Sequence, residues 1–468
     1  INVPVLYGIF SIGLALVLGV GAVGSTLAKL LSQEDNDVVV VDEDPQQLSN
    51  LEEDADIRAV HGKASHPNVL VKADIKSADM VVAVTGSDET NIVACLISKV
   101  LSKSIKTIAR IREASYLKNK TKEALKSGEI PVDVVVSPEQ LLTDHIQALI
   151  DTPGALQVME FGEGLLHLVA VKAVRGGPLI GHEIGELKKH MPKVDTRVAA
   201  IFRQDRPIIP TGTTSVEAGD EVFFIAKKGD IQKVIIEMRK KEEPYKKIII
   251  AGGGRVGYRL ASKIEPNHEV KIIEERQDRA EYLSKNLIST VVLKGNVSDK
   301  HLLHEENIEN TDVFVAVTND DEANIMSCLL AKDMGAHKVI ALINNSAYVD
   351  LVHGRGVDVA IAPSEITIGT FLSEVEGEDV VKVHSLRRGA AESIEVIAKK
   401  STNIEMNIIG KALGQIELPL GVTIGAIIRE NKAKIAHDDV ILHENDHVVI
   451  FLTDKTLLPD IKQIFSSN

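Results

Sequence analysis

The chain has 468 residues, too many for one hydrophobic core, so several domains are expected. Its 44% hydrophobic and 26% charged residues are typical of a globular protein and exclude disordered and fibrous classes. The formal net charge of -14, the 3% aromatic content and the lack of tryptophan disfavour nucleic acid and bare anionic membrane as partners. Two cysteines, Cys95 and Cys328, give no disulfide framework and no zinc cluster, which favours a reducing cytosolic compartment.

The N-terminal stretch, residues 1–28, carries no charged residue, and by length alone it suggests a membrane span. We interpret its second half instead as a strand, Leu14–Leu18, followed by a glycine-rich turn that would be out of place in lipid. A secretory signal would need a basic segment that is missing. Residues 1–13 receive no predicted role.

The first chemical motif is Gly19-x-Gly21-x-x-Gly24, between the strand Leu14–Leu18 and a predicted helix, residues 25–31. The first glycine permits a tight turn, the second lets a pyrophosphate approach the backbone, and the third lets helix and strand pack closely. The helix N-terminus offers N–H groups to phosphates. The next strand, Val38–Val41, ends in Asp42, which can accept hydrogen bonds from both ribose hydroxyls and would repel a 2′-phosphate. The motif therefore predicts NAD rather than NADP, and ATP or ADP remain open because only an ADP-ribose-like moiety is read.

Later strand ends supply further candidates for the same crevice, because ligands of such sheets bind at the carboxyl ends of strands. Lys63 lies in the run 62–65, and Thr85 and Gly86 follow a predicted strand, residues 80–84; we expect adenine and phosphate neighbours there. Arg110 and Arg112 end a third strand, and guanidinium groups suit phosphate geometry.

The glycine motif, the run 83–92 and Cys95 return 233 residues later, so one segment has been duplicated. The second copy has the strand Lys247–Ala251, the turn Gly252–Gly257 and the strand Val270–Ile273, with Glu274 in the ribose-binding place. Its Gly-Gly-Gly run and the neighbouring residues 275–276 could alter the choice of ligand. The matching third strand, residues 340–344, lacks both arginines, so the two sites should not bind the same ligand equally. Both cysteines fall at one repeat position and are expected to be buried.

The alternation of β-branched runs and helical stretches predicts an α/β fold. We expect two tandem Rossmann-like, doubly wound parallel sheets, each followed by a small α+β domain. The predicted ranges are 14–137 and 246–364 for the Rossmann domains and 153–237 and 379–466 for the small domains. The charged run 238–244, which ends in proline, is the predicted linker.

The alternative function is an NAD-dependent oxidoreductase, which would need an acid or base beside the nicotinamide. Tyr116 and Lys120 have the Tyr-x-x-x-Lys spacing of short-chain dehydrogenases, within a lysine-rich segment predicted to be helical. No recognisable catalytic serine precedes them, and His61, His66 and His145 are expected to be surface or capping residues. The duplication of both the nucleotide domain and the small domain favours a sensor that is not itself an enzyme. In such a protein, a nucleotide bound in one crevice can bias the packing of the neighbouring domains.

Several long runs resemble the TrkA family, the peripheral subunits of bacterial Trk potassium uptake systems. They are the paired glycine motifs, Ala-Val-Thr-x-x-Asp-Glu-x-Asn-Ile in both halves, and residues 109–112, 153–158, 195–203 and 385–389. The resemblance implies two regulator-of-potassium-conductance (RCK) modules per chain. It also implies a homotetrameric ring, peripheral on the cytosolic face of an integral membrane potassium transporter subunit of the TrkH or TrkG type.

The same resemblance implies that NAD or NADH and ATP or ADP bind the Rossmann crevices and gate potassium flux. Arg112 would reach a phosphate across a subunit boundary. In the first half the implied nucleotide-binding residues are Gly19, Val20, Gly21, Ala22, Val23, Asp42, Lys63, Thr85, Gly86 and Arg110. In the second half they are Ala251, Gly252, Gly253, Gly254, Arg255, Val256, Glu274 and Asn296.

Overall fold

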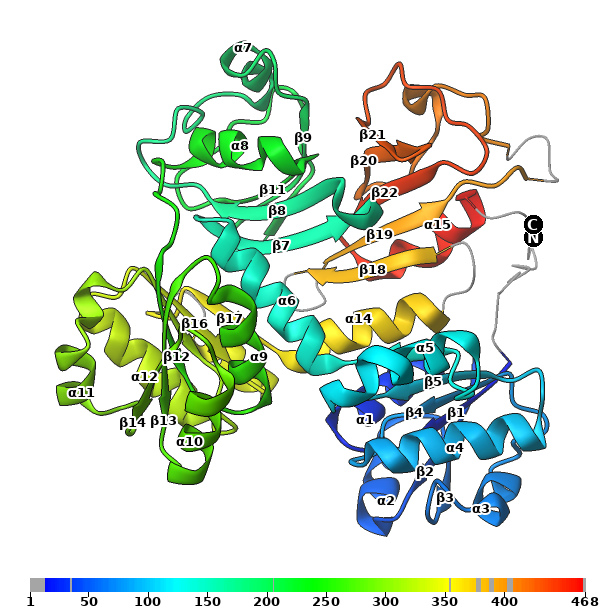
Figure 1. Ribbon diagram of the computed structural model, residues 1–468. Coiled ribbons are helices and arrows are strands. Elements are labelled where there is room, and N and C mark those ends of the chain that lie inside the picture. Colours follow the sequence, from blue (N-terminus) through cyan, green and yellow to red (C-terminus); the bar gives the residue numbers. More distant parts are fainter. Residues whose placement is uncertain are drawn as a thin grey trace. The chain divides into compact units, whose positions relative to one another are not determined.

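The computed structural model describes residues 13–33, 36–204, 206–352, 355–375, 380–386, 391–401 and 407–465. The described residues form two compact units (Figure 1). One contains residues 13–138 and 366–375, and the other contains residues 139–365 and those from 380 onward. Positions 1–12, 379, 387–389 and 466, which enter some of the expectations above, lie outside the described residues.

The first unit is built on a six-stranded parallel sheet with the order β3-β2-β1-β4-β5-β6. Its strands are rich in β-branched residues and mostly buried, as expected for a sheet that is covered on both faces. The strands are β1 (Leu14–Leu18), β2 (Asp37–Asp42), β3 (Arg58–His61), β4 (Met80–Ala83), β5 (Lys106–Arg110) and β6 (Val134–Val136). The strand order reverses between β1 and β4, which is where ligands bind in such sheets.

Two of the connecting α-helices of this unit, α2 (Pro45–Asp54) and α4 (Asp88–Leu101), begin at a side-chain cap. The Ser87 hydroxyl accepts from the Thr90 N–H at the start of α4, and in the second unit Asp320 caps α12 (Asp321–Asp333) in the same way at the repeat position. The helices are α1 (Ala22–Ser32), α2 (Pro45–Asp54), α3 (Pro67–Lys72), α4 (Asp88–Leu101), η1 (Ala114–Leu117) and α5 (Asn119–Ser127). Helix α1 begins three residues before the predicted start, so Gly21 itself is its N-cap.

The second unit contains a matching parallel sheet with the order β14-β13-β12-β15-β16-β17. Its strands are β12 (Lys247–Ala251), β13 (Glu269–Glu274), β14 (Val291–Lys294), β15 (Val313–Ala316), β16 (Lys338–Leu342) and β17 (Val359–Ile361). Its helices are α9 (Arg255–Ile264), α10 (Gln277–Asn286), α11 (Lys300–Glu305), η5 (Ile308–Asn310), α12 (Asp321–Asp333) and α13 (Ser346–Val352). Cys95 on α4 and Cys328 on α12 are both fully buried, which confirms the expectation from the repeat.

Two long helices leave the sheet that precedes them in the chain. Helix α6 (Pro138–Asp151) follows β6, yet its residues from 139 belong to the second unit, where Asp144 pairs with Lys263. Helix α14 (Pro363–Val375) follows β17, yet its residues from 366 belong to the first unit, where Glu374 pairs with Lys106 at 3.1 Å.

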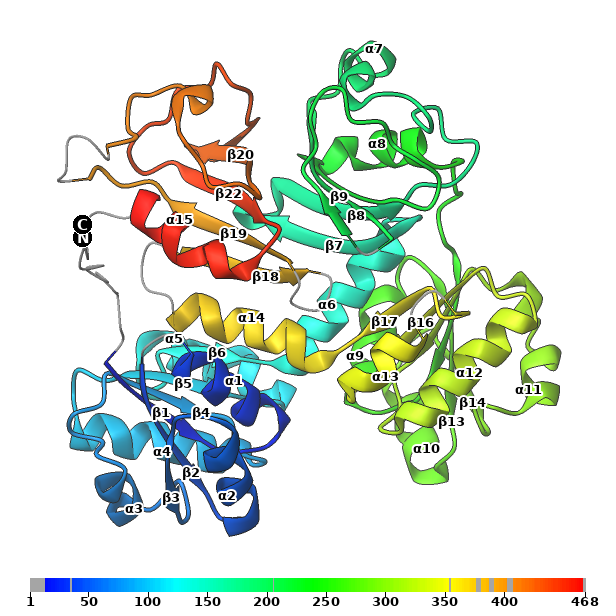
Figure 2. The ribbon, with the colours of Figure 1, turned by 180° about the vertical axis from the view of Figure 1, so that it is seen from behind.

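The second unit also holds two antiparallel sheets of five strands with the same connectivity, β10-β9-β11-β8-β7 and β21-β20-β22-β19-β18 (Figure 2). The strands of the first are β7 (Ala155–Phe161), β8 (Leu166–Lys172), β9 (Thr196–Arg203), β10 (Arg206–Ile208) and β11 (Glu221–Lys227), and those of the second are β18 (Val380–Leu386), β19 (Ala391–Ile397), β20 (Val422–Arg429), β21 (Lys432–Ile435) and β22 (His447–Leu452). Short helices complete them: η2 (Gly162–Gly164), η3 (Ile184–Glu186), α7 (Leu187–His190), η4 (Lys228–Asp230), α8 (Ile231–Met238), η7 (Leu413–Gln415), η8 (Lys455–Leu457) and α15 (Leu458–Phe465).

The two small sheets share one core. The Phe223 ring lies 5.7 Å from the Phe202 ring of its own sheet and 5.6 Å from the Phe451 ring of the other. Each sheet also repeats an ion pair, in which a partly exposed arginine of β9 or β20 donates to a buried aspartate, 1% exposed, that precedes β11 or β22. The Arg203–Asp220 pair has two bonds of 2.9 Å, and the Arg429–Asp446 pair has bonds of 2.7 and 2.6 Å.

The predicted fold class is therefore confirmed: two Rossmann-like parallel sheets are each followed by a small antiparallel domain. The four predicted domain ranges remain a prediction. No helix in the described part of the chain is long and apolar enough to cross a bilayer.

Candidate functional site

The first glycine turn joins β1 to α1 with little room for side chains. Gly19 has φ +103°, and a Cβ there would lie 2.8 Å from the Thr85 backbone nitrogen. A Cβ on Gly24 would lie 1.9 Å from the Gly19 carbonyl oxygen, so helix and strand pack closely at this point. A Cβ on Gly21 would meet no atom within 4 Å. The turn is thus tight on its sheet side and open at the helix N-terminus, as a phosphate site requires.

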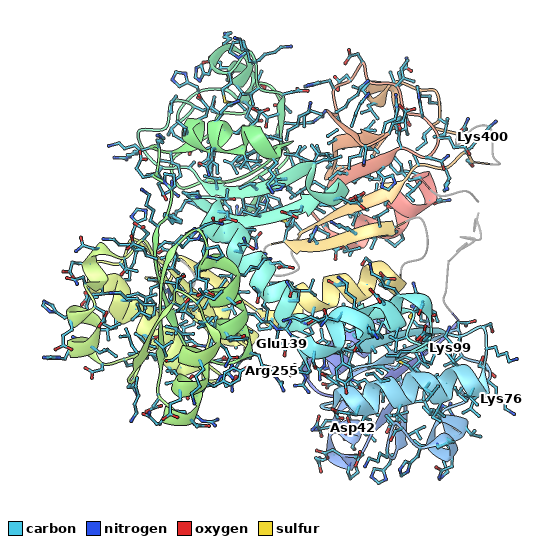
Figure 3. The ribbon with its side chains drawn as sticks, in the orientation of Figure 1. Asp42, Lys76, Lys99, Glu139, Arg255 and Lys400 are labelled. Atoms are coloured by element: carbon cyan, nitrogen blue, oxygen red, sulfur yellow. The ribbon has the colours of Figure 1, made fainter. Side chains whose placement is uncertain are left out.

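The carboxylate of Asp42 ties the end of β2 to this turn. It accepts the Val20 N–H at 2.6 Å and the Asp44 N–H at 2.9 Å. Asp42 is half-buried and is labelled in Figure 3. Val20 is 4% exposed, whereas Ala22 is exposed and Val23 is half-buried in the first turn of α1. The predicted ribose-binding acid therefore lies against the predicted phosphate-binding turn.

The ends of β4 and β5 bring two guanidinium groups to this edge of the sheet. Arg110 Nη2 donates to the Thr85 carbonyl at 2.8 Å, and the Arg112 guanidinium donates to the Gly86 carbonyl. Lys63 is exposed just after β3, where the Gly62 N–H donates to the Asp42 carbonyl at 2.8 Å. These residues belong to strand ends of one sheet, as the sequence predicted.

The second turn reproduces the first with the same contacts. Gly252 has φ +108°, and a Cβ on Gly257 would lie 1.9 Å from the Gly252 carbonyl oxygen. Glu274 accepts the Gly253 N–H at 2.9 Å, as Asp42 accepts that of Val20. A Cβ on Gly253 would lie 2.4 Å from Leu283 Cδ1 and 2.8 Å from Glu274 Oε2, so a larger residue there would require these side chains to shift.

The remaining predicted residues of the second crevice lie at the ends of β12 and β14 and at the start of α9. Ala251 is the buried last residue of β12, Gly254 is the N-cap of α9, and Val256 is half-buried in its first turn. Arg255 is exposed at the first position of α9 and is labelled in Figure 3. Asn296 follows β14 and donates to Glu275 at 3.4 Å.

A buried asparagine in each half was not predicted as a site residue. Asn91 accepts the Thr85 N–H at 2.9 Å and its hydroxyl at 2.7 Å, and donates to the Arg110 carbonyl at 2.9 Å. Asn324 makes the same bonds to Thr318 and to the Leu342 carbonyl. The repeated Ala-Val-Thr-x-x-Asp-Glu-x-Asn-Ile run was the available signal, because its threonine and asparagine have the same spacing in both halves.

The aspartate of that run marks where the halves differ. Asp88 accepts the backbone N–H groups of Arg112 and Glu113 at 3.0 and 2.8 Å. In the second half Asp321 accepts both the backbone and the side-chain amide of Asn344, each at 2.9 Å. The second crevice therefore carries an amide where the first carries a guanidinium.

The spacing that suggested a dehydrogenase is not on one helix. Tyr116 lies in η1 and Lys120 lies in α5, with a β-region residue between the two helices. The expectation of one continuous helix was wrong, and the pair lacks the regular one-turn spacing that a shared helix would impose. The expectation for His145 was also wrong: it is half-buried in α6, where burial and Lys338 lower its pKa to about 4.

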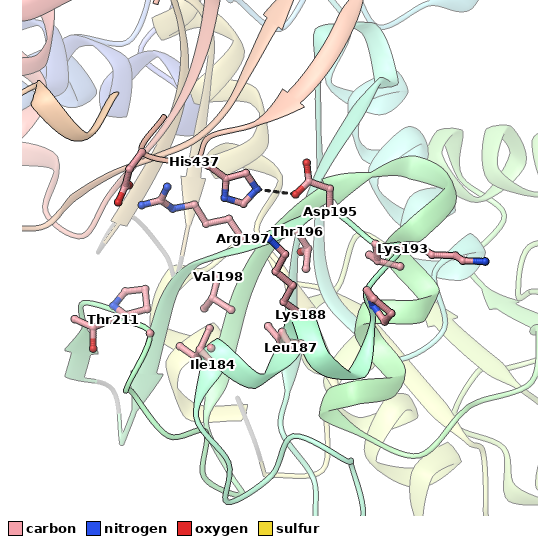
Figure 4. A pocket seen from close by; sticks show the side chains of 16 residues that line it. Ile184, Leu187, Lys188, Lys193, Asp195, Thr196, Arg197, Val198, Thr211 and His437 are labelled. Atoms are coloured by element: carbon pink, nitrogen blue, oxygen red, sulfur yellow. Dashed lines mark hydrogen bonds and ion pairs between the residues drawn. The ribbon is translucent and has the colours of Figure 1, made fainter. Parts of the chain in front are cut away.

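A cavity of about 610 Å³ in the second unit was also not predicted (Figure 4). Its walls come from η3, α7, the start of β9 and residues 210–212, together with residues 437–438 after β21. The His437 Nε2 atom lies 2.7 Å from Asp195 Oδ1 at its rim. Because residues 437–438 lie more than two hundred residues after the rest of the lining, no local motif could have revealed the complete cavity. Within the described residues, no group of three or more His, Cys, Asp or Glu side chains is arranged to hold a metal ion.

Comparison with known proteins gives a consistent result. The model of the TrkA-N domain matches residues 15–138 and 248–363, and that of the TrkA-C domain matches residues 168–236. The chain belongs to the TrkA family. This TrkA-family chain is 52% identical over 451 residues to the Trk system potassium uptake protein TrkA of Halomonas elongata, covering 96% of this chain and 98% of that protein. The predicted family resemblance is confirmed.

Solved structures support the fold of this TrkA-family chain. The GsuK RCK domain matches with a TM-score of 0.62 and 20% identity over 97% of this chain and 95% of that one. The GsuK channel bound to NAD matches with a TM-score of 0.61 and 19% identity over 97% and 79%. At these identities the likeness establishes the shared architecture alone.

Proposed function

We propose that this chain is a regulatory subunit that binds NAD(H) and ATP or ADP in its two Rossmann crevices and thereby gates potassium uptake by an integral membrane transporter subunit. The observation that carries the proposal is the duplicated glycine turn, each copy at a helix N-terminus and each tied to a carboxylate by a backbone N–H. The full-length relative named as a Trk system potassium uptake protein supports the transport role. The GsuK channel, a fold neighbour solved with NAD bound, supports the choice of ligand.

The residues of the first crevice fit an adenine nucleotide. The N–H groups of the first turn of α1 suit a pyrophosphate, and the open space beside Gly21 admits it. The Asp42 carboxylate has lone pairs beyond its two backbone bonds for ribose hydroxyls. Arg110 and Arg112 would add charge-assisted bonds to phosphate oxygens. Lys63, Thr85 and Gly86 complete the proposed site.

The second crevice offers the same turn and carboxylate with fewer cations at its strand ends. Asn344 stands in place of Arg112, and Leu342 in place of Arg110. We therefore propose that the two crevices differ in nucleotide preference, and that each occupied state shifts the packing of its unit. We further propose a homotetramer that associates with the cytosolic face of the membrane through its transporter partner.

Calorimetry with matched variants tests the binding step. Asp42→Ala should weaken ADP and NADH binding at the first crevice about tenfold, because about two hydrogen bonds to ribose are lost. Glu274→Ala should do the same at the second crevice. Each variant should leave the other crevice unchanged. Affinities and stoichiometry equal to those of the unaltered chain for both variants would contradict the assigned sites.

Potassium flux into liposomes tests the regulatory step. A TrkH- or TrkG-type subunit is reconstituted, this chain is added, and flux is followed while ATP, ADP, NAD and NADH are titrated. We expect a nucleotide-dependent change in flux that the Asp42→Ala, Glu274→Ala double variant abolishes. Flux that never responds to nucleotide in the presence of the unaltered chain would refute the proposed gating.

A further inference from the structure

An arginine of helix α10 lies behind the second glycine turn. Arg279 Nε donates to the Gly253 carbonyl at 2.6 Å, and its Nη2 donates to the Gly254 carbonyl at 3.3 Å. The guanidinium carbon lies 4.6 Å from the ring centre of Tyr282 and 5.8 Å from that of Tyr258. The two rings are 5.7 Å apart and meet edge to face. The guanidinium thus packs against two aromatic side chains while it donates hydrogen bonds to two successive carbonyls.

The geometry of the peptide unit links these carbonyls to the phosphate-facing side of the turn. The peptide planes are trans, so the C=O and the N–H of each plane point in opposite directions. The Gly253 carbonyl shares its plane with the Gly254 N–H, and the Gly254 carbonyl shares its plane with the Arg255 N–H. Both N–H groups belong to the first positions of α9, where a helix has no acceptor of its own to offer. A donor that fixes both carbonyls therefore fixes the direction of both N–H groups and also polarises them.

Only the glycine turn of the second half needs this restraint on its backbone. Its turn reads Gly252-Gly253-Gly254, and consecutive glycines lose the most backbone freedom when they are ordered. The first turn has the buried Val20 at the middle position, and its Gly21 carbonyl receives the neutral Ser25 hydroxyl at 3.0 Å.

The residues that hold the restraint are specific to the second half as well. At the positions equivalent to Arg279, Tyr282 and Tyr258, the first half has Gln47, Asn50 and Ser25. In the first half, the guanidinium groups come instead from the far side of the crevice, at the end of β5.

We propose that Arg279 is the positioning residue of the second crevice, which pre-orders the triple-glycine turn and strengthens its N–H groups toward the diphosphate of a bound nucleotide. The inference rests on the proposed binding of nucleotide in that crevice. It assigns the two crevices different sources of cationic support: strand-end arginines in front of the phosphates in the first, and one arginine behind the turn in the second. The second crevice therefore depends on Arg279 for recognition of phosphate and not for recognition of adenosine.

Calorimetry with ADP and with adenosine tests this proposal on the full chain. The Asp42→Ala background weakens the first crevice, so that the isotherm reports on the second. In this background Arg279→Ala should weaken ADP binding about tenfold, the loss of one charge-assisted contact, and should change adenosine binding by less than twofold. Arg279→Lys should recover part of the ADP affinity, because an ammonium can donate to one carbonyl but lacks the planar fork. Lys285→Ala is the matched control: it removes the same charge from an exposed side chain in the last turn of the same helix, and ADP affinity should stay within twofold.

The outcomes separate three explanations. An ADP affinity of Arg279→Ala within twofold of the background, or equal losses for ADP and adenosine, overturns the positioning role. An equal loss in Lys285→Ala also overturns it, since general charge would then account for the effect. If the Asp42→Ala chain with Arg279 intact binds no ADP, the proposed nucleotide site in the second crevice fails, which is a different result.

Discussion

Asn91 is expected to hold the first crevice together. Its side chain is fully buried and joins the end of β4 to the end of β5 through Thr85 and the Arg110 carbonyl. Asn91→Leu keeps a similar volume but removes every one of these bonds. The Thr85 N–H and the Arg110 carbonyl would be left without this partner in a buried place.

The magnitude follows from those two groups. Each buried polar group without a partner costs about 1–3 kcal/mol, so the free energy of unfolding of the first unit should fall by about 4 kcal/mol. For a unit of this size that corresponds to a decrease in melting temperature of roughly 10 °C. Nucleotide affinity at the first crevice should fall too, because Thr85 and Arg110 lose their fixed positions.

Differential scanning calorimetry and urea unfolding measure the effect. Asn50→Leu is the control, because it makes the same chemical change at an exposed position of α2 in the same unit; its effect should stay within about 0.5 kcal/mol. Asn324→Leu should lower the stability of the second unit by a similar amount, since it breaks the same bonds there. An Asn91→Leu chain that unfolds within about 1 kcal/mol of the unaltered one would refute the reasoning.

Three further predictions concern packing, reactivity and pH. Gly24→Ala should disrupt the first unit, because its Cβ would lie 1.9 Å from the Gly19 carbonyl oxygen. Gly21→Ala should lower the free energy of unfolding by less than about 1 kcal/mol, because a Cβ there meets no atom within 4 Å. Equal melting temperatures for the two variants would contradict this prediction. Both cysteines should react with a thiol reagent only after the chain unfolds, because burial raises the pKa of the Cys95 thiol to about 12 and also raises that of Cys328. Rapid labelling of the folded chain would count against their burial. Burial lowers the pKa of Lys338 from 10.5 to about 8, so between these pH values the unfolded chain binds more protons than the folded chain. The free energy of unfolding should therefore rise with pH, by up to about 3 kcal/mol. If the Lys338→Met chain shows the same rise with pH, other groups cause it.

The parts of the fold that the sequence predicted are those with local causes. The β-branched runs gave β1, β2, β4, β12 and β13 to within one or two residues, because fully buried parallel strands need a continuous apolar stretch. The glycines at 19, 24, 252 and 257 were predicted for reasons that the contacts bear out: tight turns and close approach. The 233-residue offset predicted the duplication, and it also predicted the shared burial of Cys95 and Cys328.

The sequence by itself determined the two nucleotide fingerprints, their carboxylates and the loss of arginines in the second half, since each depends on residue type and short spacing. The tertiary structure decided which groups support those turns. Asn91 reaches β5 from α4, and Arg279 reaches the second glycine turn from α10, and neither contact follows from a motif. It also decided that Tyr116 and Lys120 lie on separate helices and that α6 and α14 leave the sheets they follow. The physical reason is that such contacts depend on how elements pack, and packing is set by the whole core rather than by any stretch of neighbouring residues.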